Sequence, residues 1–196
     1  NVHLVSLADA PIERITANGI QTAAEHHDLD VIVYATGFDA ITGGYDRIDI
    51  RGVDGQTLAD KWSESPRTHL GALTHGFPNM LMVAGPQSVS GSTNFPRAIE
   101  IGVDWLTDLL VHAREQGATR IEARLEAEQH WVEEVVRAHE KMLFRRSKGW
   151  FTGYNSNVAG HQEGKIRYQA YFGGSPKYVA IIDQAAADGY PGVELV

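Results

Sequence analysis

The sequence predicts an α/β fold with long amphipathic helices and an incomplete sheet. Short apolar runs that are typical of strands alternate with two long stretches of helical periodicity. The runs that could form buried strands are too few to complete a parallel sheet. The chain of 196 residues is 43% hydrophobic and 21% charged, which is ordinary for a folded globular protein.

The amino-terminal part contains several strand-like segments. Residues 1–4 alternate apolar and polar side chains, and residues 12–16 and 20–23 flank an Ala-Asn-Gly turn, a pattern typical of a hairpin. Residues 28–35 form a continuous apolar run with β-branched members, closed by a Thr-Gly pair. Such a run predicts a strand that is buried on both faces, as in a parallel sheet.

The middle and the end of the chain mix loops with further elements. Residues 40–79 are rich in glycine and proline breakers, and residues 80–84 have the composition of another short buried strand. Towards the carboxyl end, residues 149–165 predict an extended loop, residues 168–172 a strand and residues 176–187 a last helix.

Two longer helices are predicted between these parts. The first begins after Thr93 or Asn94 as its N-cap, has Pro96 in its first turn and ends at Gly117. Its apolar residues recur at helical spacing, at Ile99, Val103, Leu106 and Leu110. The second spans about residues 122–143, and its apolar side consists of Leu125, Val132, Val135 and Met142. Three tryptophans are expected in the core, namely Trp62, Trp105 and Trp131.

Composition excludes several classes of function. The formal net charge of −8 argues against a nucleic-acid partner, which needs a basic surface. Without cysteine there are no disulfides or thiolate sites, and a reducing cytoplasm is the expected location. No apolar run approaches the roughly 20 residues that span a bilayer, so no membrane association is expected. His26 and His27 have no third ligand nearby in the sequence, so no metal site is expected.

Three segments have the character of ligand-binding loops, and the first follows the run at residues 28–35. It contains the small residues Ala35, Thr36 and Gly37, followed by Asp39. Small residues after a strand let a ligand approach the backbone closely at the edge of a sheet. The alternative is an ordinary strand-ending turn.

The other two segments lie at residues 85–96 and 149–157. The former leads into the predicted helix start at Asn94 and Phe95, where unpaired N–H groups and a partial positive charge suit an electron-rich group. The alternative is a helix that is merely capped. The latter places Trp150 beside a second aromatic residue between glycines. It either closes over a bound cofactor or substrate, or is pinned to the core by Trp150.

These segments occur in the order seen in Baeyer–Villiger monooxygenases, which the chain resembles over its whole length. The similar stretches are VIVYATGFDAITGGYDRIDIRGVDG, KWSESPRTHLGALTHGFPNMLMVAGPQS, and WFTGYNSNVAGH leading to YFGGSPKY. The resemblance implies the carboxy-terminal part of a flavoprotein with two Rossmann-like dinucleotide-binding domains. Residues 1–38 would end the NADP-binding domain and form the return crossing. Residues 39–196 would complete the FAD-binding domain, with a mobile loop at 149–165.

The resemblance also implies cofactors and site residues. In this family NADPH reduces FAD, and one atom of O₂ is inserted next to a ketone carbonyl to give an ester or lactone. The implied cofactor-binding residues are Ala35, Thr36, Gly37, Asp39, Asn94, Phe95 and Trp150. The implied border of the substrate pocket consists of Gly91, Ser92 and Phe95.

Two departures from the family pattern limit what this chain can do alone. It contains no G-x-G-x-x-G phosphate loop and no match for the family's active-site arginine, so no catalytic residue is assigned. We expect the isolated chain to be inactive and to need the amino-terminal part of the same enzyme, in one chain or as a second one. Two alternatives are another flavin monooxygenase of this fold, such as an N-hydroxylase, and a non-catalytic interaction module.

Overall fold

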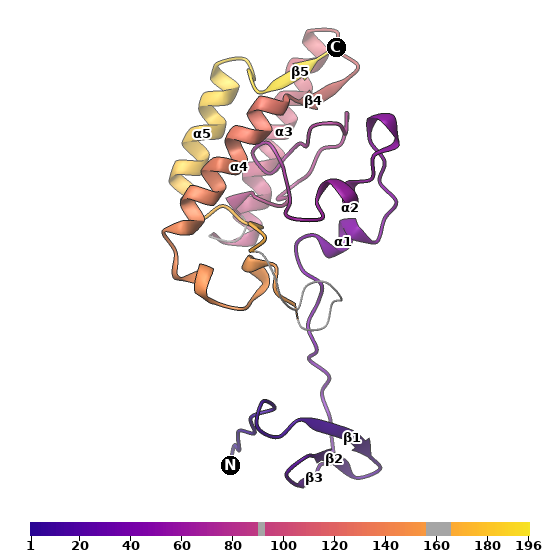
Figure 1. Ribbon diagram of the computed structural model, residues 1–196. Coiled ribbons are helices and arrows are strands. Elements are labelled where there is room, and N and C mark those ends of the chain that lie inside the picture. Colours follow the sequence, from indigo (N-terminus) through magenta and orange to yellow (C-terminus); the bar gives the residue numbers. More distant parts are fainter. Residues whose placement is uncertain (90–92, 156–165) are drawn as a thin grey trace. The chain divides into compact units, whose positions relative to one another are not determined.

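The computed structural model describes residues 1–89, 93–155 and 166–196 (Figure 1). The chain forms two compact units, Asn1–Phe38 and Asp39–Val196. Across the described ranges, none of the helices combines the length and the apolar character that crossing a membrane requires. The cytoplasmic location remains a prediction.

The first unit is a small antiparallel sheet. Strands β1 (Ile12–Thr16), β2 (Gly19–Thr22) and β3 (His26–Asp28) lie in the order β1-β2-β3. The predicted hairpin is confirmed, and the third strand was not predicted. The turn needs glycine at its end, because a Cβ on Gly19 would lie 1.9 Å from the carbonyl oxygen of His27.

Two strands predicted in this unit are wrong. Residues 1–4 and 29–35 have no strand assignment, and their apolar side chains face solvent. Leu4 is 98% exposed and Val33 is 81% exposed. A strand is stable only when neighbouring strands satisfy its backbone groups and cover its side chains. Within the described residues no neighbouring strand pairs with either segment.

The second unit is built on three helices that lie side by side (Figure 1). These are α3 (Phe95–Glu115), α4 (Leu125–Glu140) and α5 (Ser175–Ala187). Strands β4 (Ile121–Ala123) and β5 (Val193–Leu195) pair antiparallel at one end of the helices. The core between the helices contains Trp105 of α3 and Trp131 of α4, and Trp105 donates a hydrogen bond from Nε1 to the carbonyl of Ile182 in α5.

Helix α3 begins and ends as the sequence predicts. The side chain of Asn94 accepts a hydrogen bond from the N–H of Arg97, Pro96 lies in the first turn, and Gly117 adopts a φ of +69° just beyond the end. Its buried face is rotated from the predicted one. Ile99, Val103 and Leu110 are 42%, 43% and 47% exposed. The residues that α3 buries are Ala98, Trp105, Leu106, Leu109 and Ala113.

Helix α4 starts later than predicted, because residues 121–123 form β4 instead of a first helical turn. Its buried face also differs from the predicted one: Leu125 is 40% exposed, whereas a carboxylate, Glu128, is fully buried. The residues that α4 buries are Glu128, Trp131, Val135, Ala138 and His139.

The loop-rich segment at 40–79 is confirmed, with the short helices α1 (Gly43–Asp46) and α2 (Leu58–Lys61) and a 3₁₀ turn at Val53–Gly55. Trp62 is fully buried beside α2, as predicted for the tryptophans. The strands predicted at 80–84 and 168–172 are wrong: both segments carry no strand assignment. Helix α5 is confirmed to within one residue.

Candidate cofactor site

The first predicted segment lies at the junction of the two units. Ala35, Thr36 and Gly37 belong to the end of Asn1–Phe38 and are exposed, and Gly37 has a φ of +81°. Asp39 opens the second unit and is half-buried. Its side chain lies against Gly43, where a Cβ would come within 2.3 Å of the carboxylate carbon. The three small residues are exposed, and their role in binding a ligand stays a prediction.

The second predicted segment contains the amino end of α3. Asn94 caps the helix and Phe95 is its first residue, with its ring 55% exposed. The first turn carries no acidic residue, so the partial positive charge of this 21-residue helix is not neutralised from within the turn. Gly91 and Ser92 lie outside the described residues. An exposed ring at an uncompensated helix amino end is suited to an electron-rich aromatic ligand.

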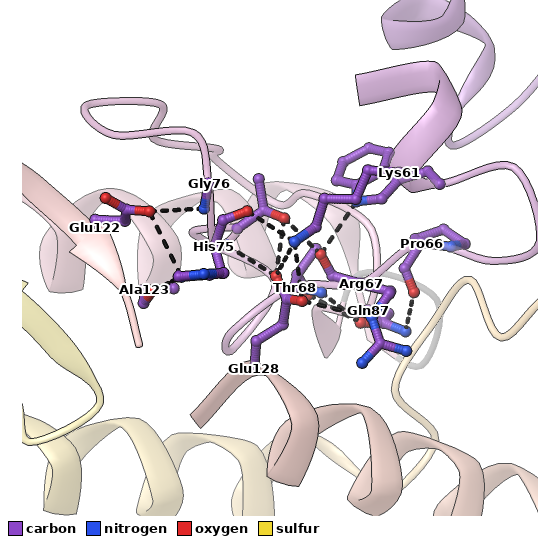
Figure 2. A network of polar contacts seen from close by, with 12 residues as sticks. Lys61, Pro66, Arg67, Thr68, His75, Gly76, Gln87, Glu122, Ala123 and Glu128 are labelled. Carbon is purple, nitrogen blue, oxygen red and sulfur yellow. Dashed lines mark hydrogen bonds and ion pairs between the residues drawn. The ribbon is translucent and has the colours of Figure 1, made fainter. Parts of the chain in front are cut away.

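A buried glutamine fixes the loop that leads to this helix (Figure 2). The side-chain oxygen of Gln87 accepts hydrogen bonds from the N–H and the hydroxyl of Thr68, both at 3.0 Å. Its amide nitrogen donates to the carbonyls of Pro66 at 2.7 Å and Tyr168 at 3.2 Å. All four hydrogen-bonding positions of this amide are thus satisfied. Gln87 also holds a φ of +66°, an unusual conformation that these bonds stabilise.

A buried carboxylate supports the same loop region from α4 (Figure 2). Glu128 lies 3.0 Å from the ammonium of Lys61 and 3.5 Å from the guanidinium of Arg67. It also accepts hydrogen bonds from the hydroxyl of Thr74 at 3.0 Å and the N–H of His75 at 2.8 Å. A carboxylate with so many donors is compensated for the loss of water. Arg67 directly precedes Thr68, so this cluster fixes the partner of Gln87.

A second carboxylate ties the same loop to β4. Glu122 is 2% exposed and accepts a hydrogen bond from the N–H of Gly76 at 2.7 Å. Burial alone raises the pKa of this carboxyl, but the Arg120 guanidinium, the Gly76 amide and His75 together hold its pKa below the usual value. The loop at 66–76 is therefore fastened at two points, by the side chains of Glu128 and Glu122.

Of the third predicted segment, residues 149–154 form a compact turn, here named the Trp150 turn, and residues 156–165 of the predicted loop lie outside the described residues. It contains a 3₁₀ helix (Trp150–Thr152) and closes with Gly153 at a φ of +76°. Thr152 is 6% exposed, and its hydroxyl donates to the carbonyl of Gly149 at 2.8 Å. Trp150 is 50% exposed, while Thr152 and its hydrogen bonds lie inside the turn. Closure over a ligand and attachment to the core by Trp150 both stay predictions.

One extended stretch, residues 167–171, contacts both the Trp150 turn and the loop at Gln87. The N–H of Arg167 donates to the carbonyl of Thr152 at 3.0 Å, and the N–H of Gln87 donates to the carbonyl of Gln169 at 2.8 Å. The structure therefore brings two of the three predicted segments onto a common backbone support. The sequence showed the segments but not this connection.

The supporting residues are those that sequence reasoning missed. Glu128 and His139 lie on the apolar face of α4, in register with Trp131 and Val135. A charged or polar residue inside an apolar stripe was the available signal. Gln87 gave no such signal, because its partners come from distant parts of the chain.

Among the described residues, no group of three or more His, Cys, Asp or Glu side chains could hold a metal ion. The absence of a metal site at His26 and His27 stays a prediction. The Nε2 atom of His26 instead lies 2.8 Å from the hydroxyl of Thr16 within the small sheet.

Comparisons with known proteins bear on this arrangement. No protein-family model matches the chain. It is 40% identical over 195 residues to cyclopentanone 1,2-monooxygenase of Comamonas sp. and 42% identical over 197 residues to acetone monooxygenase (methyl acetate-forming) of Gordonia sp.. It is also 39% identical over 193 residues to phenazine N-monooxygenase PhzNO1 of Lysobacter antibioticus. These matches cover 98% to 100% of the chain but only 34% to 36% of the relatives.

Solved structures agree with the sequence comparison. The fold matches cyclohexanone monooxygenase from Rhodococcus sp. Phi1 bound to NADP⁺, with a TM-score of 0.86 and 38% identity over 97% of the chain. It matches OTEMO in complex with FAD and NADP with a TM-score of 0.88 and 37% identity over the whole chain. The chain spans about 35% of each of these proteins. In sequence and in fold, the chain is therefore similar over its whole length to Baeyer–Villiger monooxygenases, and it spans about a third of the length of these relatives.

Proposed function

We propose that this chain is the carboxy-terminal part of a Baeyer–Villiger monooxygenase that uses FAD and NADPH. In the proposed reaction one atom of O₂ is inserted between the carbonyl carbon of a small ketone and a neighbouring carbon, which gives an ester or lactone. The second oxygen atom leaves as water, and NADPH supplies the two electrons. The observation that carries the proposal is the amino end of α3, which has an exposed Phe95 and no acidic residue in its first turn, in a chain that matches this family throughout.

The described residues fit one end of FAD. Asn94 and Phe95 would lie against the flavin ring, and the uncompensated amino end of α3 would stabilise the negative charge that the ring acquires on reduction. Bound flavin would carry electrons from NADPH to O₂. The chain has no glycine-rich phosphate loop, so the two pyrophosphates would be held by residues outside it.

The remaining predicted residues are assigned to NADP and to the ketone. Ala35, Thr36 and Gly37 would offer accessible backbone to NADP, with Asp39 beside them. The exposed indole of Trp150 would cover the nucleotide, because a large apolar ring in water gains free energy when a flat ligand covers it. The ketone pocket would be bordered by Phe95 together with Gly91 and Ser92.

The two units would correspond to parts of two domains. Residues 1–38 would end the NADP-binding domain and form the return crossing, and residues 39–196 would complete the FAD-binding domain. The exposed apolar run at 29–35 supports this assignment, because strands supplied by the rest of the enzyme would cover it. The partly exposed face of α3 at Ile99, Val103 and Leu110 would be covered in the same way.

Oxygen transfer to a ring nitrogen is the second candidate function. It is favoured by the 39% identity to phenazine N-monooxygenase, which is close to the identity to the ketone monooxygenases. The residues of the chain that would contact flavin and NADP serve both reactions. The substrate, a ketone or an aromatic nitrogen heterocycle, would be selected largely by residues outside the chain.

A chimaera tests the proposal. This chain would replace the matching third of the Comamonas cyclopentanone 1,2-monooxygenase, and the purified protein would be assayed for bound FAD, NADPH oxidation and lactone. We expect a yellow enzyme that forms lactone, and a Trp150→Ala version with a KM for NADPH raised about tenfold or more, equivalent to about 1.4 kcal/mol. Leu143→Ala, which shortens another exposed apolar side chain, is the matched control and should leave the KM unchanged.

The outcomes separate the candidates. A chimaera that folds but holds no FAD contradicts the proposal as a whole. A chimaera that holds FAD but shows the same KM with and without Trp150 contradicts the assignment of that residue. A parallel chimaera with phenazine N-monooxygenase decides the second candidate: higher restored activity in that host than in the ketone monooxygenase favours N-oxygenation.

A further inference from the structure

A histidine is buried beneath the Trp150 turn. His139 lies in the last turn of α4 and is 0% exposed. Among the described residues, neither of its ring nitrogens has a partner in hydrogen-bonding geometry. Buried polar groups normally find such partners, so an imidazole without one is unusual. The His139 ring instead makes its contacts as an aromatic group, with Tyr168 and Phe172.

The neighbours of His139 form an aromatic cluster, here defined as His139, Phe151, Tyr168 and Phe172. The His139 ring meets Tyr168 edge-on at a centroid distance of 5.2 Å and Phe172 at 5.6 Å. Phe172 in turn meets Phe151 edge-on at 5.3 Å. Edge-to-face contacts at these distances stabilise packing in a defined geometry.

The cluster connects α4 to the turn through side chains that point inward. Phe151 directly follows Trp150, so fixing the Phe151 ring fixes the direction in which the exposed indole leaves the turn. Tyr168 belongs to the stretch that binds Thr152 and Gln87 through its neighbours. His139 thus touches both the support of the turn and, through Phe172, the turn itself.

We propose that His139 is a positioning residue whose neutral imidazole holds the Trp150 turn in place, and that protonation of the ring releases the turn. This inference depends on the proposed function in one respect, which is that the ligand covered by Trp150 is a nucleotide. A charged imidazolium in this cluster would lie among aromatic rings, which do not replace the water that it loses on burial, and this is costly. Movement of the turn would then change the exposure of Trp150.

Burial favours the neutral form of His139. Burial lowers the pKa of His139, and the Glu140 carboxylate on α4 and the nearby backbone of Phe151 oppose this shift only in part. On the stretch at 166–172 the ionisable groups are the phenols of Tyr168 and Tyr171 and the guanidinium of Arg167, which donates to the carbonyl of Trp62 at 2.9 Å. The Trp150–Thr152 helix contributes no ionisable side chain.

Hydrogen exchange of the 196-residue chain tests the proposal without any cofactor. The reporters are the N–H groups of Thr152, Gly153 and Tyr154, which bond within the turn, and of Arg167, which bonds to it. His139→Ala should lower the protection of these amides at least about tenfold while the amides of α3 keep theirs. His139→Phe keeps an aromatic ring and should retain the protection at pH 7. His130→Ala, an exposed histidine of the same helix, is the matched control.

The pH dependence separates positioning from ordinary core packing. After correction for intrinsic exchange, the protection of the turn in the parent chain should fall as the pH is lowered from 7 to 5, and in His139→Phe it should stay level. Unchanged protection in His139→Ala overturns the proposal, as does a loss spread evenly over the whole chain. Equal pH dependence in the parent and His139→Phe overturns the role of protonation. These results are independent of whether the chain serves a flavoenzyme.

Discussion

The carboxylate of Glu128 lies 3.0 Å from the ammonium of Lys61, although 67 residues separate them in the chain. Both groups are removed from water: the side chain of Glu128 is fully buried and that of Lys61 is 10% exposed. The ammonium also donates to the carbonyl of His75 at 2.7 Å. This pair joins α4 to α2 and to the loop at 66–76, which contains Thr68, the partner of Gln87.

Removing the charge of Glu128 should destabilise the chain strongly. Glu128→Gln keeps the shape of the side chain but leaves Lys61 as an uncompensated buried cation, which costs about 3–5 kcal/mol in comparable sites. The free energy of unfolding, measured by urea denaturation, should fall by that amount. Glu126→Gln, an exposed position two residues earlier on the same helix, should change it by less than about 0.5 kcal/mol. A loss below about 1 kcal/mol for Glu128→Gln would mean that the pair contributes little.

Gln87 should matter for stability and for the site together. Gln87→Ala leaves the buried N–H of Thr68 and the carbonyl of Pro66 without their partner, at about 1–3 kcal/mol for each unsatisfied group. Urea denaturation should show this loss, and the chimaera carrying Gln87→Ala should hold less FAD. The matched control is Gln129→Ala, an exposed glutamine on α4. If FAD content were unchanged in a destabilised chimaera, the loop would not be needed to support the flavin.

Stability should fall as the solution is acidified below pH 6.5. Burial lowers the pKa of His69 to about 4, while the unfolded chain keeps the ordinary value near 6.5. The unfolded state therefore binds a proton first, and the stability present above pH 6.5 is lost progressively as the pH falls to 4. At pH 5 this loss is about 2 kcal/mol, at about 1.4 kcal/mol for each pH unit between the two values.

A substitution isolates this contribution. His69→Gln removes the titrating group, so its unfolding free energy should fall by about 2 kcal/mol less between pH 7 and pH 5 than that of the parent. His130→Gln, at an exposed position, should keep the parent's pH dependence. Identical slopes for all three proteins would show that His69 is protonated as easily in the folded chain as in the unfolded one.

The exposed face of α3 should make the isolated chain self-associate. Ile99 and Leu110 present apolar side chains to water beside the buried face of the helix. Ile99→Lys combined with Leu110→Lys should shift the chain toward monomer in sedimentation velocity while leaving its unfolding free energy within about 0.5 kcal/mol. Leu106→Lys, on the buried side, should instead unfold the chain. A parent chain that is already monomeric at high concentration contradicts the expectation.

The isolated chain should bind FAD weakly or not at all. It offers the amino end of α3 to the flavin ring but has no loop for the pyrophosphate, which supplies much of the affinity for a dinucleotide. Equilibrium dialysis against FAD, followed by a visible spectrum, measures this directly. A tight yellow complex with one FAD for each chain would show that the site needs no residues from elsewhere.

The sequence by itself determined the elements whose signals are local. The cap at Asn94, the proline after it and the glycine beyond the last turn defined α3, and the Ala-Asn-Gly turn defined the hairpin of the first unit. The aromatic pair at Trp150 was visible as an unusual loop. Each of these features depends on residues a few positions apart, so the pattern and its physical cause are contained in one segment.

The tertiary structure alone decided what is buried and what supports the site. Apolar runs at 29–35 and 80–84 do not form strands here, because a strand requires partners that these segments do not meet within the described residues. The buried face of α3 was set by the helices packed against it, and Glu128, Gln87 and His139 contact partners that lie far along the chain. Local sequence patterns do not predict such contacts, because packing between remote segments determines them.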